Sequence, residues 1–449
     1  MIRQTLTTVA IAMSAAVVHA GTLHTASVGS ELEVTLQTDR LDAADALDPT
    51  ITRGSRAKLE RIDVYAADAR ILVPDSNGGY RELPRNDERY FISAADAPGR
   101  RFFVALSADG KRFRSTVFGV GGSQELTGDV VGNSLVFRHL AKSNASDAKA
   151  DFQCAAEGGS MVASPAHNLD DSAVGKQRHA LAGSLHQAII AIDTDNELMD
   201  LKFSDITSAA TTYLSDLFAG MNVMYERDLD VRLVQGTTYL RTSDVADPYS
   251  QTATNNQLNE VGGYWKDNHS AVNRAFVAFL SGKSPSASSG NGIAWVLTSG
   301  NYCSSKGFDQ GGGQISGHYS ATQIVRSTGA GFNVSLVGHE IGHNFGASHT
   351  HCTDIDTGSA DVATNTIDQC FSGEGGCYSG PTSCPNDPSM LNPTQGSVMS
   401  YCHSCSIQTQ FHPTQQVTLG ARISTNIGNG CFTAVGGGGG GDIFANGFE

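Results

Sequence analysis

The sequence predicts a β-rich N-terminal part followed by an α/β (α+β) domain with a twisted mixed sheet and a disulfide-rich C-terminal subdomain. Three observations predict this organisation. Strand-like patterns fill the chain to about residue 150, strands alternate with helices from about residue 187, and eight of the nine cysteines follow residue 300. Alternating strands and helices favour an α/β sheet, and clustered cysteines favour a small subdomain held by disulfides.

The composition is that of a globular protein without a nucleic-acid partner. Hydrophobic residues make up 40% of the 449 residues, which is enough for a proper core, and the 50 glycines predict long loops. The formal net charge is −15. Because no basic stripe is present for phosphate groups, we expect no binding of nucleic acid.

The first 20 residues have the features of a secretory signal peptide. Arg3 supplies a positive charge, Leu6 to Val18 is mostly apolar, and Val18-His19-Ala20 fits a cleavage site. A weak amphipathic helix is the alternative. The apolar run is too short to span a membrane, and no other stretch is long enough. We therefore expect residues 1–20 to be a signal peptide and the protein to be secreted, where disulfides are permitted.

The region from residue 21 to about residue 150 is predicted to consist of strands and turns. Strand patterns cover Leu59–Tyr65, Ile71–Val73 with Tyr80, Phe102–Leu106 and Phe113–Phe118. The last two flank Asp109-Gly110, which is a strong hairpin signal. Nothing in this region has the spacing of a catalytic or metal site.

The second domain combines strands and helices. Strands are predicted at Gln187–Ile192, Val231–Val234, Ala275–Leu280 and Gly292–Leu297, and helices at Phe203–Tyr225, Asn256–Trp265, from near Asn333, and Thr414–Asn426. After residue 349 the chain becomes coil-rich, with six cysteines up to Cys405. A subdomain without its own core needs such cross-links; a second metal bound by these cysteines is the alternative. Residues 436–449 form a glycine linker and a short tail, either a disordered remnant or a sorting or attachment tag.

The pattern His339-Glu340-x-x-His343-x-x-Gly346-x-x-His349 is the main candidate for chemistry. Positions four apart on a helix share a face, so His339 and His343 can bind one ion together. Gly346 tolerates the positive φ of a helix end, and a bend there would bring His349 back as a third ligand. Three protein ligands leave a tetrahedral Zn²⁺ with an open position for water.

Other interpretations of the histidines remain open. A histidine-rich helix without metal is the alternative to the whole site. His351 and His403 are rivals for the third ligand position. His318 and His412 are expected to be ordinary surface or loop residues.

A second pattern lies downstream at Ser397-Val398-Met399-Ser400-Tyr401. A long histidine motif followed by a methionine turn resembles the metzincin clan of zinc endopeptidases. The chain looks closest to bacterial reprolysin (adamalysin)-like enzymes, because Asp193-Thr194-Asp195-Asn196-Glu197 and the order strand, long helix, strand resemble the start of that domain.

This resemblance implies a metzincin-type catalytic domain and a metalloendopeptidase that hydrolyses protein or peptide substrates. His339, His343 and His349 would bind one Zn²⁺, with Glu340 as the general base and Met399 as an apolar floor. No residue pattern supports a Ca²⁺ site, although calcium is compatible with such an enzyme. A zinc-containing binding or adhesion module and a non-peptide amidase on the same fold are the alternatives; the carboxylate of Glu340 favours an enzyme.

Two positions leave the subfamily open. Thr350 follows the third histidine, where adamalysins, serralysins and astacins have aspartate, proline and glutamate. Tyr401 resembles the tyrosine of astacins and serralysins that reaches the metal or stabilises the oxyanion, and adamalysins lack it. Tyr401 is therefore a candidate catalytic residue, with core packing as the alternative. In adamalysins the first and last cysteines of the domain pair, which implies a Cys303–Cys431 disulfide.

The substrate-binding edge is also implied by the resemblance. In metzincins the strand ahead of the zinc helix lies at the sheet edge and pairs with extended substrate. Gln314–Ser320 or Ile324-Val325 has that position in this sequence, with an ordinary loop as the alternative.

Cys154 is the odd cysteine, alone in the N-terminal half. Its thiolate could take the fourth metal position and keep the enzyme silent, which resembles the cysteine switch of matrix metalloprotease and adamalysin propeptides. A buried inert thiol and a bond to another chain are the alternatives. We predict an inhibitory β-rich propeptide at 21–178, an activating cut by another protease near Arg178, and a catalytic domain at 179–435.

Overall fold

The computed structural model describes residues 31–38, 56–93, 102–119, 122–132, 134–139, 184–284, 290–296, 301–304, 308–311, 314–324, 330–402, 405 and 409–435. The predicted signal peptide, Cys154, His403, the boundary near Arg178 and the tail at 436–449 lie outside these residues. Within them, no helix has the length and apolar character needed to cross a membrane.

The N-terminal part forms a closed β-barrel, which agrees with the strands predicted there. The barrel order is β1-β2-β5-β6-β7-β8-β9, with neighbours antiparallel except for the parallel closure of β1 on β9. Gly110 has a φ of 66°, as the predicted hairpin between β6 and β7 requires. The strands are β1 (Glu31–Thr38), β2 (Arg56–Ile62), β5 (Arg89–Ser93), β6 (Phe102–Leu106), β7 (Arg112–Gly119), β8 (Gly122–Val131) and β9 (Ser134–His139).

The second part is built on a mixed sheet in the order β13-β16-β12-β10-β11-β3-β4, with β17 paired to the start of β10. Its inner strands run parallel, and the two end strands, β13 and β4, are antiparallel to their neighbours. The strands are β3 (Ile71–Pro74), β4 (Tyr80–Leu83), β10 (His186–Thr194), β11 (Val231–Tyr239), β12 (Phe276–Ser281), β13 (Gly292–Ala294), β16 (Tyr319–Gln323) and β17 (Thr433–Ala434).

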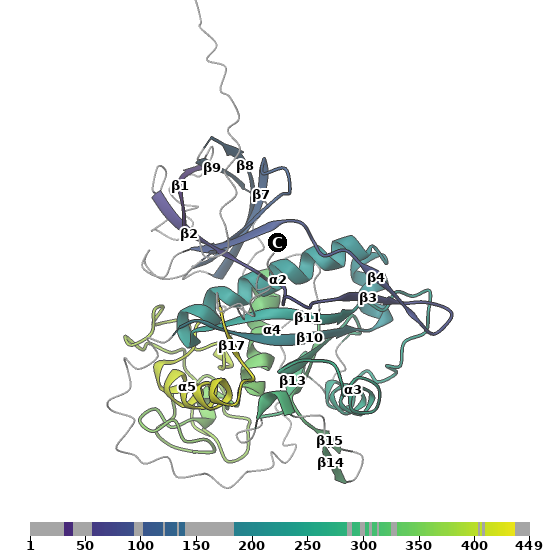
Figure 1. Ribbon diagram of the computed structural model, residues 1–449. Helices are drawn as coiled ribbons and strands as arrows, with labels where there is room; N and C mark the ends of the chain where they lie inside the picture. Colours follow the sequence, from purple (N-terminus) through teal and green to yellow (C-terminus); the bar gives the residue numbers. More distant parts are fainter. Residues whose placement is uncertain are drawn as a thin grey trace, which may run out of the picture.

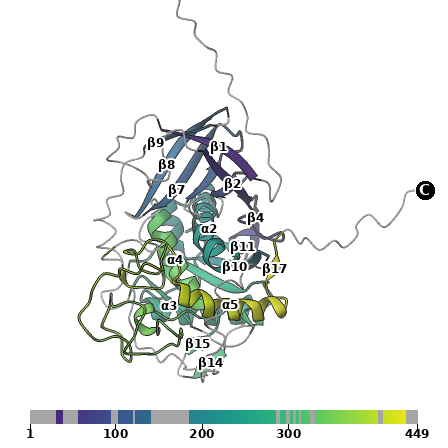
Figure 2. The same ribbon diagram turned by 90° about the vertical axis from the view of Figure 1, so that its left-hand side faces the viewer.

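Helices cover both faces of this sheet, and Figure 1 shows α2 between the barrel and strands β10 and β11. Ile190 and Ile192 of β10 pack into the core that contains α2 (Thr207–Leu229) and α4 (Ala330–Asn344). Ala191, between them, packs into a second core with α3 (Thr254–Asn268) on the opposite face. Both faces of the strand are therefore apolar, as expected for a parallel strand covered on two sides. Figure 2 shows α2 and α4 directly beneath the barrel.

Two features of the sheet differ from the sequence predictions. The hairpin β3–β4 comes from the N-terminal part but extends the sheet of the second part by pairing with β11. The predicted substrate-pairing segment is not at the edge of the large sheet: Gln314–Ser316 forms β15, which pairs with β14 (Phe308–Gly311) in a separate two-stranded sheet, and Tyr319–Gln323 lies between β12 and β13. Of the other predicted segment, Ile324-Val325, the second residue lies outside the described residues. The edge strand of the large sheet beside α4 is β13. The position of a strand in a sheet depends on how the chain crosses over and not on its order in the sequence.

The C-terminal part is a coil held by disulfides and closed by helix α5 (Pro413–Gly428). Four pairs form, at Cys303–Cys431, Cys352–Cys377, Cys370–Cys402 and Cys384–Cys405. The predicted Cys303–Cys431 pair is confirmed. A second metal on these cysteines is ruled out in this state, because a disulfide sulfur is not a thiolate ligand. Short helices lie at η2 (Leu198–Lys202), η3 (Tyr302–Ser304) and η4 (Thr350–Cys352).

Candidate active site

Helix α4 carries the first two histidines of the site. His339 and His343 lie one turn apart, and both are almost fully buried. Their rings meet nearly at right angles, with the two Nε2 atoms 3.0 Å apart. The predicted sharing of one helix face is therefore present in the structure.

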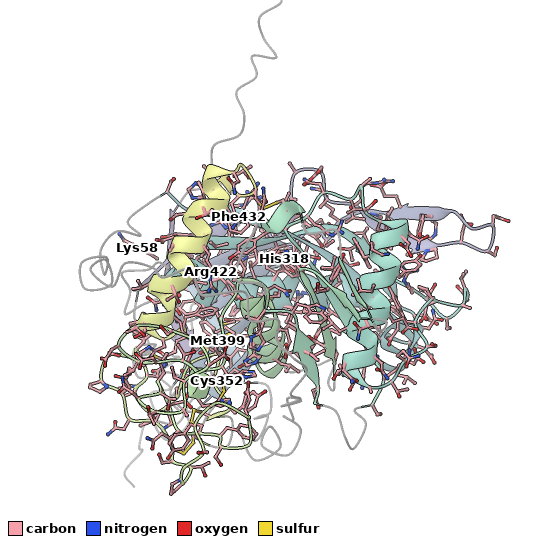
Figure 3. The ribbon with its side chains drawn as sticks, turned by 90° about the horizontal axis from the view of Figure 1, so that it is seen from below. Lys58, His318, Cys352, Met399, Arg422 and Phe432 are labelled. Atoms are coloured by element: carbon pink, nitrogen blue, oxygen red, sulfur yellow. A yellow bond between two sulfur atoms is a disulfide. The ribbon has the colours of Figure 1, made fainter. Side chains whose placement is uncertain are left out.

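The third histidine returns to the site through the end of α4. Gly346 has a φ of 95°, and its N–H donates to the carbonyl of His343 while the N–H of Ala347 donates to the carbonyl of Gly342. This is the hydrogen-bond pattern of a Schellman helix end, in which glycine is favoured. The guanidinium of Arg422, labelled in Figure 3, donates from α5 to the carbonyl of Gly346.

After this bend His349 places its Nε2 atom 3.1 Å from that of His343. Each Nδ1 of the three rings faces an acceptor at 2.7 Å: the carbonyl of Val398 for His339, the carbonyl of Ala347 for His343, and a carboxylate for His349. Each Nδ1 therefore carries the proton, and each Nε2 presents a lone pair.

Three lone pairs that face one another at 3.0 to 3.1 Å cannot hydrogen-bond to one another. A cation between them satisfies all three, and imidazole nitrogen is a preferred ligand of zinc. The residues present therefore fit a bound Zn²⁺. The same three histidines form a group whose ligand atoms lie close enough to share one ion.

Burial keeps the rings of His339 and His343 neutral. It lowers the pKa of His339 well below the ordinary value, and the neighbouring His343 and His349 lower it further. Burial lowers the pKa of His343 to about 3, again helped by His349. Only the neutral ring can offer a lone pair to a metal, so the apolar surroundings favour the ligand form of both histidines.

The methionine turn lies against the helix at the level of the histidines. Met399 is fully buried, and the turn is held by the N–H of Ser400 donating to the carbonyl of Ser397 at 3.0 Å. A Cβ on Gly342 would collide with the sulfur of Met399, so glycine at this position allows close approach. Met399 also ties the turn to the third histidine, because its carbonyl accepts from the N–H of Thr350 at 3.1 Å.

Glu340 lies beside the histidines and against the edge strand. Its side chain is 1% exposed. A Cβ added to Gly292 of β13 would collide with the Glu340 carboxylate, so the backbone of the edge strand and this carboxylate are neighbours. The carboxylate therefore lies against β13, the strand at this end of the described sheet.

A further carboxylate, which the sequence did not indicate, completes the site. Glu374 Oε2 accepts from Nδ1 of His349 at 2.7 Å and from Nε2 of His351 at 2.8 Å. Burial raises the pKa of Glu374, but the hydrogen bonds from these two histidines outweigh it and hold the pKa below its usual range. Nε2 of His351 is thus engaged in a hydrogen bond to Glu374, and His351 is not a third ligand beside His339 and His343.

No sequence signal identifies Glu374. It lies 25 residues after His349 in a glycine-rich loop, and the disulfide Cys352–Cys377 brings that loop to the histidines. Loop carboxylates have no periodic pattern, so only the cross-linked fold shows this contact.

Tyr401 packs against the third histidine. The ring of Tyr401 lies 4.5 Å from that of His349 and 5.0 Å from that of His351, and Phe371 contacts its other side at 4.9 Å. Tyr401 is 4% exposed. The tyrosine therefore helps to fix the plane of the His349 ring.

Two histidines expected at the surface are buried instead. His318 is 3% exposed, lies among Phe276 and Tyr302, and has no hydrogen-bond partner on either ring nitrogen in the described part of the chain. His412 is also 3% exposed, and its Nε2 bonds to Asp387 at 2.8 Å as it caps α5. Both residues lie in loops, as one of the two predicted alternatives has it, but neither is at the surface, because tertiary packing covers these loops.

A site of three imidazoles beside a carboxylate is that of a metal-dependent hydrolase. A family model for metallo-peptidase family M12, of the reprolysin type, matches residues 185–411. The chain belongs to metallo-peptidase family M12. It is a zinc-dependent metalloendopeptidase, and proteins or peptides are its substrates.

Solved structures were also compared. Metalloproteinase-II from Bacteroides fragilis is 11% identical, with coverage of 71% of this chain and 82% of that chain, at a TM-score of 0.33. A chaperone-substrate complex is 11% identical, with coverage of 82% of this chain and 46% of that chain, at a TM-score of 0.31. No curated protein matches the chain.

Proposed function

We propose that this chain is a secreted zinc endopeptidase made as a latent zymogen, with His339, His343 and His349 as zinc ligands and Glu340 as the general base. The observation that carries this proposal is the convergence of three Nε2 lone pairs beside a buried carboxylate. Zinc bound there would polarise the scissile carbonyl and lower the pKa of the attacking water.

Strand β13 is the proposed binding surface for the substrate. As an antiparallel edge strand it offers backbone donors and acceptors to an extended peptide, which can add to the sheet as one more strand. Because Gly292 lies against Glu340, a peptide on this edge passes beside the carboxylate. Glu340 takes the proton from the attacking water and passes it to the leaving amine.

The orientation of the ligands is set by their hydrogen bonds. The acceptors on the three Nδ1 atoms hold each ring in the tautomer whose Nε2 is free for the metal. Met399 fills the space under the helix, and Gly346 and Arg422 fix the bend that returns the third ligand.

Casein digestion by the purified protein, with and without chelator, tests the function. We expect digestion to stop on chelation and to return with zinc. Glu340→Gln should retain zinc and lose activity, whereas Glu82→Gln, on the exposed strand β4, should keep both. Digestion that survives chelation, or that survives in Glu340→Gln, would falsify the mechanism.

The proposed zymogen has three parts: a signal peptide at 1–20, an inhibitory propeptide at 21–178 and a catalytic domain at 179–435. In it, Cys154 binds the metal in the latent form only, and a cut near Arg178 releases it. Cys154→Ala should make the uncut protein active on casein from the start. A silent Cys154→Ala protein would remove the switch from the proposal.

Tyr401 is proposed as the second catalytic residue, with its hydroxyl on the oxyanion. The variant Tyr401→Phe keeps the ring that packs on His349 and removes only the hydroxyl. We expect kcat to fall by roughly 100-fold, which is the usual loss for one oxyanion donor. An unchanged kcat would mean that Tyr401 only packs against His349 and takes no part in catalysis.

A further inference from the structure

The outer wall of the barrel is apolar where it faces α2. Along β6, Phe102, Val104 and Leu106 belong to the core inside the barrel, whereas Phe103 and Ala105 belong to the core that contains α2 and α4. Side chains alternate between the two faces of a strand. A barrel that stood alone would place polar residues on its outer face, so this wall is a contact face.

From Leu217 to Glu226, helix α2 is covered on all sides. Every residue from Leu217 to Glu226 is buried, which is the mark of a helix packed around its whole circumference. A Cβ on Gly220 would meet Val334 of α4 at 2.5 Å, Phe118 of the barrel at 3.4 Å and Phe103 at 3.6 Å. Barrel, α2 and α4 thus meet without a gap at this glycine.

The hairpin β3–β4 links the N-terminal part of the chain to the sheet of the second part by main-chain hydrogen bonds. The N–H of Leu240 donates to Leu72 at 2.9 Å, and the N–H of Thr238 donates to Arg70 at 2.8 Å. The side chain of Leu72 joins the core around Trp265 on the far face of the sheet. Without this hairpin, β11 would be an open edge.

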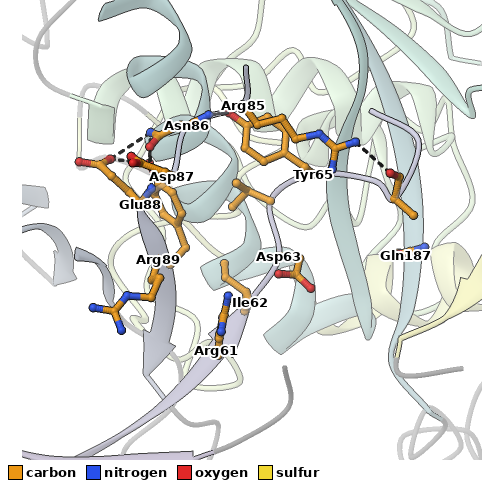
Figure 4. A pocket seen from close by; sticks show the side chains of 13 residues that line it. Arg61, Ile62, Asp63, Tyr65, Arg85, Asn86, Asp87, Glu88, Arg89 and Gln187 are labelled. Atoms are coloured by element: carbon orange, nitrogen blue, oxygen red, sulfur yellow. Dashed lines mark hydrogen bonds between the residues drawn. The ribbon is translucent and has the colours of Figure 1, made fainter. Parts of the chain in front are cut away.

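The chain path ties hairpin and barrel together. It leaves the barrel after β2, forms β3 and β4 in the sheet, and returns to the barrel as β5. The two connecting segments, at residues 61–67 and 85–90, line a pocket of about 490 Å³ together with Gln187 of β10 (Figure 4). Any separation of the barrel from the sheet must therefore also strip β3 from β11.

A polar cluster closes the contact between barrel and α2. The guanidinium of Arg114 donates to Glu88 at 2.7 Å and to Asp216 of α2 at 3.0 Å. The hydroxyl of Tyr90 donates to Asp216 at 3.1 Å. These charged groups, which are partly buried, must find new partners if the two surfaces part.

We propose that the barrel and the hairpin are a permanent half of the peptidase fold, and that a cut between residues 140 and 183 yields a two-chain protein rather than a free catalytic domain. The hydrogen bonds and ring contacts that hold the three histidines come from residues 339–401, and no described barrel residue takes part in them. The described barrel can therefore stay bound without holding or displacing a histidine of the site. In this view, activation near Arg178 frees the cleft and keeps the barrel.

The test uses the full chain with Glu340→Gln, so that the protein does not digest itself. A recognition sequence for a site-specific protease is placed between residues 158 and 164. After complete cutting, we expect the two pieces to elute together at the mass of the uncut chain in gel filtration and native mass spectrometry. Elution of a folded piece that begins after the cut, without its N-terminal partner, would overturn the proposal.

A matched pair of variants locates the bond between the pieces. In the same background, Leu72→Asp places a charge in the core beneath β3, and Arg81→Asp places the same charge on the exposed strand β4. We expect cutting to release the pieces of Leu72→Asp and to leave those of Arg81→Asp together. Equal retention in both would show that β3 pairing does not hold the unit, and the wild-type cut decides the proposal even where Leu72→Asp fails to fold.

Discussion

Glu374 Oε2 accepts a hydrogen bond from Nδ1 of His349 at 2.7 Å. The same oxygen accepts from His351, whose ring stacks on that of His349 with the ring centres 5.2 Å apart. The coil between Cys352 and Cys377 thus delivers a carboxylate to the ring that is proposed as the third ligand. This arrangement makes the loop part of the proposed metal site.

Glu374→Gln should weaken zinc binding. The amide keeps one oxygen but loses the charge that fixes the tautomer of His349, so we expect the zinc affinity to fall roughly 10- to 100-fold. Competition with a fluorescent zinc chelator measures it. Asp361→Asn, an exposed position on the same coil, is the control. An affinity equal to the wild type would mean that the ring keeps its orientation without the carboxylate.

Removal of the Cys352–Cys377 disulfide, by Cys352→Ser with Cys377→Ser, should lower both the free energy of unfolding and the affinity for zinc. Its ends are 25 residues apart, and closing a loop of this length contributes about 3 kcal/mol to the free energy of unfolding. Because Glu374 lies inside that loop, the serine double variant should also bind zinc more weakly.

The Cys384–Cys405 disulfide is the comparison, since its ends are 21 residues apart and its loop contains Met399 and Tyr401 but not Glu374. We expect a similar loss of stability in urea from the two double variants, and a larger loss of zinc affinity from the first. An equal loss of zinc in both would assign the effect to general loosening of the coil.

Gly292→Ala should impair catalysis while zinc stays bound. The new Cβ meets the Glu340 carboxylate and must push it out of place, whereas the ligands are untouched. A displacement of about 1 Å costs roughly 100-fold in kcat/KM. Peptide hydrolysis and zinc content are measured together. Gly263→Ala, where the nearest atom is 3.9 Å from the added Cβ, is the control. Wild-type kcat/KM would show that the carboxylate moves freely.

His318 predicts acid sensitivity. Burial lowers its pKa from 6.5 to about 3, so between these pH values the unfolded chain binds a proton that the folded chain does not. The free energy of unfolding therefore falls as the pH drops below about 6.5, by up to about 1.4 kcal/mol per pH unit. His318→Phe, among aromatic neighbours, removes this contribution.

Urea unfolding of wild type and His318→Phe gives the measurement. Relative to their difference at about pH 7, the variant should gain about 2 kcal/mol at about pH 5. Because other titrating groups are shared, they cancel in the comparison. A difference that does not change with pH would mean that the imidazole is hydrated or paired in the folded protein.

Much of the second domain was predictable from sequence because its elements are long and strongly patterned. Helix α2 was expected at Phe203–Tyr225 and lies at Thr207–Leu229, and α3 was expected at Asn256–Trp265 and lies at Thr254–Asn268. The ligand spacing was equally readable, since a helix fixes the distance from His339 to His343. Gly346 has the positive φ that was expected of it.

What the sequence could not show depends on contacts between distant segments. Nothing in Ile71–Val73 distinguishes a barrel strand from an extension of the peptidase sheet, because both need a buried strand. The position of Gly292 at the sheet edge follows from a crossover, and the meeting of Glu374 with His349 follows from a disulfide. Pairing partners and loop paths have no periodic signature.

The Cys303–Cys431 disulfide spans 128 residues of sequence. The three histidines proposed as ligands lie inside this covalent ring, together with Glu340, Met399 and Glu374. A glycine-rich coil is a target for cleavage by other copies of an endopeptidase. One hydrolysed bond in a ring opens it without releasing a fragment. The enzyme can therefore suffer a nick in its own active-site coil and keep every ligand on one covalently joined molecule.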